Sequence, residues 1–227
     1  KIHLYKSSID LLNKIQKIKQ NKIKNFRNKL YKLPKYEKKK LFAETKLFSL
    51  WYAQRFIPKK KLAKFNILIN KQIKILLSSI KIKTNVFVHR DFHVSNLMGN
   101  KKELRIIDTQ DALLGNRAYD LASLIDDVRF KTKSKFKDQI YNYFMKSNKN
   151  LINKKNFLND FEILSVLRNM KIIGIFTRLA IRDKKRTYLK LIPYTWKLIE
   201  SRIENNEKFN ELKKILDLNF SKKIRNS

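Results

Sequence analysis

Apolar residues recur every three to four positions over most of the chain before residue 84 and again after residue 117. This spacing places them on one face of an α-helix, with lysines on the other face. Leu33-Pro34 and Pro58 interrupt the pattern and predict breaks between helices. Helices are therefore predicted over residues 4–24, 37–56, 65–82, 119–130, 136–145, 157–181, 188–203 and 209–218.

The pattern changes between residues 85 and 116. Val86–Val88 and Leu104–Ile107 are short, mainly apolar runs, which are typical of strands. A turn is predicted at Gly99–Lys102, and a polar loop lies between the two runs. The sequence thus predicts a mainly α-helical α+β protein with a small β-hairpin core. Its parts would be a helical segment at 1–84, a loop-and-hairpin segment at 85–116 and a second helical segment at 117–227.

The charge of the chain is extreme. Of 227 residues, 54 are basic and 19 acidic, which gives a net charge of +35. The excess is mostly lysine spread along the whole chain, together with abundant asparagine and isoleucine. All three have A/T-rich codons, so genome composition is the favoured explanation and nucleic-acid binding the alternative.

Other features of the composition exclude several kinds of site. With no cysteine, the chain has no disulfides, thiolate metal sites or cysteine nucleophiles. No apolar run approaches the length of a membrane span, and the N-terminus lacks the apolar core of a signal peptide. A cytoplasmic protein without a membrane partner is the expectation.

The polar loop contains the residue types that phosphoryl transfer to an alcohol requires. His89-Arg90-Asp91 follows the first apolar run, Asn96 comes five positions after Asp91, and Asp108 follows the second run. A carboxylate can orient the acceptor hydroxyl and take its proton, while two oxygen ligands hold Mg²⁺ against nucleotide phosphates. Aspartate and asparagine are also common turn formers, but the complete set favours a catalytic loop.

The motif His89-x-Asp91-x-x-x-x-Asn96-Leu97, with Asp108 after it, resembles the aminoglycoside phosphotransferase (choline kinase-like) family, which has a protein-kinase-like fold. Residues 108–124 match the third motif of that family. Residues 33–51 and 168–189 resemble one bacterial branch most closely. That branch contains the anomeric sugar kinases that phosphorylate N-acetylmuramate and N-acetylglucosamine in cell-wall recycling.

The resemblance implies a role for each matching residue. Asp91 would be the catalytic base or hydroxyl-orienting carboxylate, and Asn96 and Asp108 would be Mg²⁺ ligands. The residues that would brace the loop or serve structural roles are His89, Arg90 and Asp120. Candidates for the acceptor side are His93, Asp111, Arg168, Arg178, Arg182 and Asp183, of which Asp111 is also an alternative metal ligand.

A kinase of this fold also needs a β-rich N-terminal lobe with a phosphate-binding loop and a strand lysine. Nothing before Val86 predicts such a sheet, and the chain has only three glycines. Residues 4–16 resemble the helix that follows the interlobe hinge. The expectation is therefore a C-terminal lobe whose N-terminal β lobe is missing, a fragment inactive by itself that needs that lobe in cis or in trans.

The resemblance implies phosphoryl transfer that depends on ATP and Mg²⁺, from a nucleotide to the anomeric hydroxyl of an amino sugar. An antibiotic phosphotransferase of the aminoglycoside type is one alternative. Its polycationic substrates call for an acidic cleft, whereas the segment after Arg168 is basic. A non-catalytic basic module for RNA or another polyanion is the other alternative. The intact set of Asp91, Asn96 and Asp108 argues against it, so nucleic acid is not the expected partner.

Overall fold

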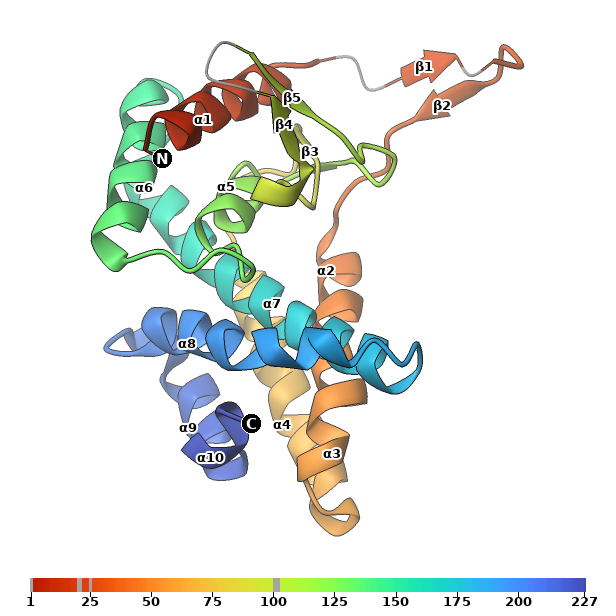
Figure 1. Cartoon of the computed structure of the whole chain (residues 1–227), viewed down its shortest axis with the longest axis vertical. Helices are drawn as coiled ribbons and strands as arrows, with labels where there is room; N and C mark the ends of the chain where they lie inside the picture. Colours follow the sequence, from red (N-terminus) through yellow and green to blue (C-terminus); the bar gives the residue numbers. More distant parts are fainter. Residues whose placement is uncertain (1, 20–21, 25, 100–102) are drawn as a thin grey trace. The chain divides into compact units, whose positions relative to one another are not determined.

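The computed structural model of the chain describes residues 2–19, 22–24, 26–99 and 103–227. It is rich in helices and contains a few short strands (Figure 1), in agreement with the predicted mainly helical α+β class. The chain divides into two compact units and passes from one to the other at three places, one of which falls within a long helix. The first unit comprises Lys1–Glu37 and Lys81–Phe161, and the second comprises Lys38–Ile80 and Glu162–Ser227.

The first unit contains the strands and the predicted catalytic loop. Its elements are α1 (Ile2–Gln16), β1 (Lys22–Lys24), β2 (Leu30–Lys32), β3 (Val86–Val88), η2 (Val94–Asn96), β4 (Leu97–Gly99), β5 (Leu104–Ile106), β6 (Leu113–Gly115), α5 (Ala118–Ile125), α6 (Ser134–Ser147) and the first residues of α7 (Lys154–Ile181). The predicted strands at 86–88 and 104–107 are both present. The predicted turn at 99–102 falls largely outside the described residues.

The strands form three antiparallel pairs, β1 with β2, β3 with β6 and β4 with β5. In the β3–β6 pair, Val86 lies opposite Gly115 and Val88 lies opposite Leu113. Lys35 adds a parallel bridge to Leu114 on the other side of β6. Strand β6 was not predicted, because Leu113 and Leu114 followed by Gly115 give too short an apolar run for a strand pattern.

Helix α1 packs along α6, as Figure 1 shows. The Tyr5 ring meets the edge of the Phe136 ring at 4.9 Å between centroids, and Ile9 and Leu12 are fully buried. The prediction of one helix over residues 4–24 is wrong beyond Gln16. Ile18 is exposed, so the apolar spacing there is not used for packing, and Lys22–Lys24 pairs with Leu30–Lys32 as strands β1 and β2 instead.

The second unit is helical. Its elements are α2 (Lys38–Thr45), the π-helical turn η1 (Phe48–Ala53), α3 (Gln54–Phe56), α4 (Lys59–Ser78), the remainder of α7, η3 (Arg186–Leu191), α8 (Ile192–Ile203), η4 (Glu207–Phe209), α9 (Asn210–Asn219) and α10 (Lys222–Arg225). Helix α4 begins six residues before the predicted start, directly after Pro58. Its first turn is three lysines, which favour helix but carry no apolar signal.

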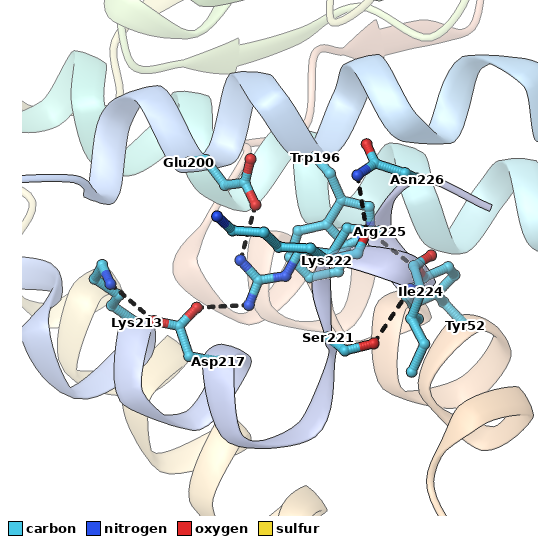
Figure 2. A network of polar contacts seen from close by, with 10 residues as sticks. All are labelled: Tyr52, Trp196, Glu200, Lys213, Asp217, Ser221, Lys222, Ile224, Arg225 and Asn226. Carbon is cyan, nitrogen blue, oxygen red and sulfur yellow. Dashed lines mark hydrogen bonds and ion pairs between the residues drawn. The ribbon is translucent and has the colours of Figure 1, made fainter.

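An aromatic cluster forms the core of the second unit. The rings of Phe48, Tyr52, Trp196 and Phe220 lie with centroids 5.4–5.8 Å apart. The indole N–H of Trp196 donates to the Tyr52 hydroxyl at 2.9 Å. Figure 2 shows Arg225 beside this cluster, with its guanidinium bonded to Glu200 and Asp217. The C-terminal helix is thereby attached to the core.

Within residues 2–19, 22–24, 26–99 and 103–227, no helix has both the length and the apolar character needed to cross a bilayer.

Candidate catalytic site

The predicted catalytic loop leaves β3 at Val88 and closes with the short turn η2. The backbone carbonyl of Asp91 accepts two hydrogen bonds, from the N–H of His93 at 3.0 Å and from Nδ2 of Asn96 at 2.9 Å. Asparagine commonly stabilises turns through such side-chain to backbone bonds. The five-residue spacing from Asp91 to Asn96 is therefore what closes the loop.

These bonds leave two oxygen groups available. The half-buried carboxylate of Asp91 makes no hydrogen bond or ion pair to any residue that the structure describes. Because Nδ2 of Asn96 is engaged, its Oδ1 is the atom left for a ligand. A carboxylate can accept a proton from a hydroxyl, and an amide oxygen can bind a hard cation.

The β4–β5 hairpin returns the chain to this loop just before Asp108. The N–H of Ile107 donates to the Asn96 carbonyl at 3.1 Å, and Nε2 of His89 lies 2.9 Å from the Ile107 carbonyl. Asp108 follows directly, is exposed, and has a left-handed backbone with φ of 68°. Such a conformation is unfavourable for a residue other than glycine and is frequent at functional sites. The structure therefore places Asp108 directly after a residue bonded to Asn96, whose side chain is in turn bonded to Asp91.

The oxygen atoms at this place suit Mg²⁺. Magnesium in phosphotransferases is held by one or two protein oxygen groups together with substrate phosphates and water. Oδ1 of Asn96 and the carboxylate of Asp108 form such a sparse set, and Gln110 donates to Asp108 Oδ1 at 2.5 Å. Over the described ranges, no three His, Cys, Asp or Glu side chains gather in a way that could hold a metal by themselves.

Asp120 connects the loop to helix α5. Its side chain is fully buried and accepts hydrogen bonds from the backbone N–H of His89 at 2.7 Å and of Arg90 at 3.0 Å. Arg90 itself has φ of 77°, a left-handed conformation. The carboxylate thus holds the chain where it turns away from β3, and a bracing role for Asp120, His89 and Arg90 stays our prediction.

Two further buried carboxylates, which were not among the residues predicted from the sequence, hold this region. Asp127 accepts from the N–H of Val94 at 3.1 Å, at the far end of the loop. Asp160 accepts from the N–H groups of Lys81 and Ile82, both at 2.8 Å, before β3 begins. The signal available in the sequence was an acidic residue within an apolar helical stretch, since a buried carboxylate needs partners.

The acceptor-side candidates of the first unit have different surroundings. His93 is buried next to the fully buried Phe92. Asp111 is exposed, and its Oδ1 lies 3.8 Å from Nη1 of Arg90. The guanidinium of Arg90 lies over the Tyr36 ring, 5.5 Å from its centroid. Asp111 therefore faces Arg90, and its roles as a metal ligand or acceptor contact stay predictions.

The other four candidates belong to the second unit: Arg168 lies in the middle of α7, Arg178 lies in its last turn, and Arg182 and Asp183 follow it. Arg182 and Asp183 form a two-point ion pair, with distances of 2.7 and 3.0 Å, and the hydrogen bond from Arg182 lowers the pKa of Asp183. Arg168 is only 5% exposed, and its Nη1 has no hydrogen-bond partner in the described part of the chain. These four residues and the catalytic loop belong to different units, and the acceptor role of the four residues stays a prediction.

Comparisons with known proteins agree with this geometry. The model of the phosphotransferase enzyme family (APH) matches residues 3–144. An N-acetylmuramate/N-acetylglucosamine kinase of Neisseria meningitidis serogroup B is 32% identical over 166 residues, which are 71% of this chain and 50% of the relative. Kinases with the same name from Pseudomonas aeruginosa and Pseudomonas putida are 29% identical over 193 residues and 26% identical over 218 residues.

Those two matches cover 81% and 94% of this chain and 56% and 62% of the relatives. The chain therefore spans between 50% and 62% of the length of these three relatives. The resemblance inferred from the loop and from residues 33–51 and 168–189 is confirmed. Because the family model covers more than half of the chain and includes the whole catalytic loop, the chain belongs to the phosphotransferase enzyme family.

Proposed function

We propose that this chain supplies the catalytic loop and the metal ligands of a kinase that uses ATP and Mg²⁺ to phosphorylate an amino sugar. The acceptor would be the anomeric hydroxyl of N-acetylmuramate or N-acetylglucosamine, the two sugars in the names of the relatives. The observation that carries the proposal is the unengaged carboxylate of Asp91, held beside Asn96 and Asp108 by backbone hydrogen bonds.

Each loop residue has a task in this proposal. Asp91 would accept a hydrogen bond from the sugar hydroxyl, orient its oxygen toward the terminal phosphate and take its proton. Asn96 and Asp108 would hold Mg²⁺, which neutralises charge on the phosphates when it is bound. Asp120 and Asp127 would keep Asp91 in position, since they bind the backbone on both sides of it.

The proposal includes a second lobe. Kinases of this fold bind the nucleotide phosphates with a loop and a strand lysine of an N-terminal lobe. We propose that such a lobe, in cis or in trans, completes the nucleotide site.

The test measures phosphate transfer from ATP to N-acetylmuramate, N-acetylglucosamine and kanamycin, in a preparation that includes the proposed N-terminal lobe. The expected result is transfer to one or both amino sugars and none to kanamycin. Asp91→Asn should lower kcat by about a hundredfold or more, because general-base catalysis contributes at least that much. Asp138→Asn, which changes an exposed aspartate of α6, is the matched control and should retain activity.

Two results would overturn the proposal. One is a near wild-type rate for Asp91→Asn, which would remove Asp91 from the reaction. The other is phosphorylation of kanamycin but of neither amino sugar, which would favour the antibiotic-modifying alternative.

A further inference from the structure

A large open cavity lies in the first unit, away from the catalytic loop. Its volume is about 1070 Å³. The walls come from the end of α1, the residues before α2, the residues before β3 and the region from β6 to the start of α5. Asp91 follows β3, whereas Lys83–Asn85, which line the cavity, precede it. The cavity is therefore at the opposite end of this strand from the proposed phosphoryl-transfer site.

The cavity is strongly basic. Its charged lining residues are five cations and one carboxylate, Lys17, Lys19, Lys35, Lys83, Arg117 and Glu37. None of the four lysines forms an ion pair with another residue of the described ranges. A concave surface with charge of one sign concentrates ions of the opposite sign. The lining therefore favours an anionic occupant.

Arg117 is positioned in this cavity by neutral groups. Its Nη1 donates to Oδ1 of Asn148 at 3.2 Å, and Asn148 is itself buried and donates to Oδ1 of Asn13 and to the Phe144 carbonyl, both at 2.9 Å. Within the described part of the chain no carboxylate contacts the guanidinium. Burial accordingly lowers the pKa of Arg117.

The surroundings of Arg117 contrast with those of Arg225 in the second unit. Arg225 is bonded to two carboxylates, Glu200 and Asp217 (Figure 2). A partly buried cation is unfavourable unless an anion accompanies it. Arg117 is thus a pre-positioned cation whose anion is not supplied by the residues around it.

Gln16 carries a second polar group whose need for a hydrogen-bond partner is not met by the described residues. Its side chain is 4% exposed and lines the cavity, and its Nε2 donates to the Arg117 carbonyl at 2.9 Å. The remaining atom, Oε1, has no hydrogen-bond partner among the residues described. A buried amide oxygen requires a donor, which a hydroxyl group can provide.

We propose that this cavity binds a small molecule that carries a phosphate group and hydroxyl donors, at a site separate from the catalytic loop. The planar guanidinium of Arg117 matches two oxygens of a phosphate, and Lys35 and Lys83 add further charge. A hydroxyl of the same molecule donates to Oε1 of Gln16. The volume exceeds that of inorganic phosphate and lies in the range of sites for larger metabolites.

The test titrates the chain with inorganic pyrophosphate by calorimetry at physiological ionic strength. Saturable binding of one equivalent is expected. The double variant Arg117→Gln with Lys83→Gln should weaken affinity by about tenfold or more, because it removes two charged hydrogen-bond donors. The double variant Lys59→Gln with Lys60→Gln, two exposed lysines of α4 outside the cavity, removes the same charge and should change affinity less than about twofold.

Three results would overturn the proposal. The first is the absence of saturable binding by the wild-type chain. The second is a loss of affinity in the α4 variant as large as that in the cavity variant, which would mean attraction by net charge alone. Tighter binding of single-stranded RNA than of pyrophosphate, with both double variants equally affected, would indicate a polyanion surface. If Arg117→Gln lowers the thermal stability, Lys35→Gln with Lys83→Gln repeats the test, because both side chains are exposed.

Nuclear magnetic resonance locates the bound probe independently. Addition of pyrophosphate should shift the side-chain amide signals of Gln16 and leave those of Asn96 in place. Shifts at Asn96 with none at Gln16 would place the anion at the catalytic loop and refute the separate site.

Discussion

The Asp120 carboxylate accepts a 2.7 Å hydrogen bond from the backbone N–H of His89, although the two residues are 31 positions apart. Its second oxygen accepts a hydrogen bond from the backbone N–H of Arg90. The first turn of α5 is therefore attached to the point where β3 becomes the catalytic loop. The position of Asp91 depends on this attachment, because Asp91 is the next residue.

Replacing Asp120 by asparagine should destabilise the protein. An amide has one acceptor oxygen, so its NH₂ group would face one of the two backbone N–H groups that the carboxylate now satisfies. We expect a loss of about 2 kcal/mol in the free energy of unfolding, the typical effect of a buried unsatisfied donor. Urea denaturation measures it, with Asp138→Asn as an exposed control. A loss equal to that of the control would show that the two bonds contribute little.

Gly174 permits close packing of α7 in the second unit. A Cβ at this position would lie 2.6 Å from the Phe48 nitrogen and nearer still to backbone atoms of Leu47. Gly174→Ala should therefore lower the free energy of unfolding by about 1–3 kcal/mol, as overpacking does. Helix propensity alone would give a gain of up to about 1 kcal/mol. The sign of the change in unfolding free energy, measured by urea denaturation, therefore shows whether the close backbone contact or the higher helix propensity of alanine dominates.

Tyr52 should make stability depend on pH above 10. Burial raises the pKa of this phenol from 10.0 to about 12, against the opposing hydrogen bond from Trp196. The folded state thus keeps the proton that the unfolded state releases, so the free energy of unfolding falls as pH rises from 10 toward 12. The fall is at most about 1.4 kcal/mol per pH unit.

Tyr52→Phe is the matched comparison, because it removes this titration and leaves the lysines unchanged. The difference in unfolding free energy between wild type and Tyr52→Phe should be constant below pH 10 and change progressively above it, in the direction that favours the variant. Urea denaturation of both proteins at several pH values between 8 and 11.5 measures this difference in unfolding free energy. A difference that stays constant up to pH 11.5 would contradict the raised pKa.

Arg225 should contribute to stability through the geometry of its guanidinium. Its two nitrogens lie 2.8 Å from Oε1 of Glu200 and 2.6 Å from Oδ1 of Asp217, and it lies over the Trp196 ring (Figure 2). Because both carboxylates are partly exposed, water would compensate in part for the loss of Arg225. We expect Arg225→Gln to lower the free energy of unfolding by about 1–3 kcal/mol.

The variant Arg225→Lys separates geometry from charge. Lysine keeps the charge but cannot form both bonds in one plane, so it should restore only part of the loss. Lys222→Gln, at an exposed position of the same helix, controls for the change in net charge. Full restoration by lysine in urea denaturation would mean that charge alone matters.

The sequence by itself determined the family to which the chain belongs and most of the helices. The spacing of Asp91, Asn96 and Asp108 is a local property, and so is the apolar periodicity that predicts α6, α7 and α9. Local patterns suffice here, because a helix or a turn is stabilised by contacts between residues close in sequence. The family resemblance rests on the same short motifs.

Only the tertiary structure decided which distant residues support that loop. Strand β3 pairs with β6, and Asp120 and Asp127 accept hydrogen bonds from the loop, so segments far apart in the sequence are joined. The end of α1 at Gln16 was likewise not predictable from the apolar spacing, which continues beyond it. The cavity around Arg117 likewise forms where separate parts of the chain meet. Periodicity cannot predict such contacts, because they depend on how the buried faces of several elements pack together.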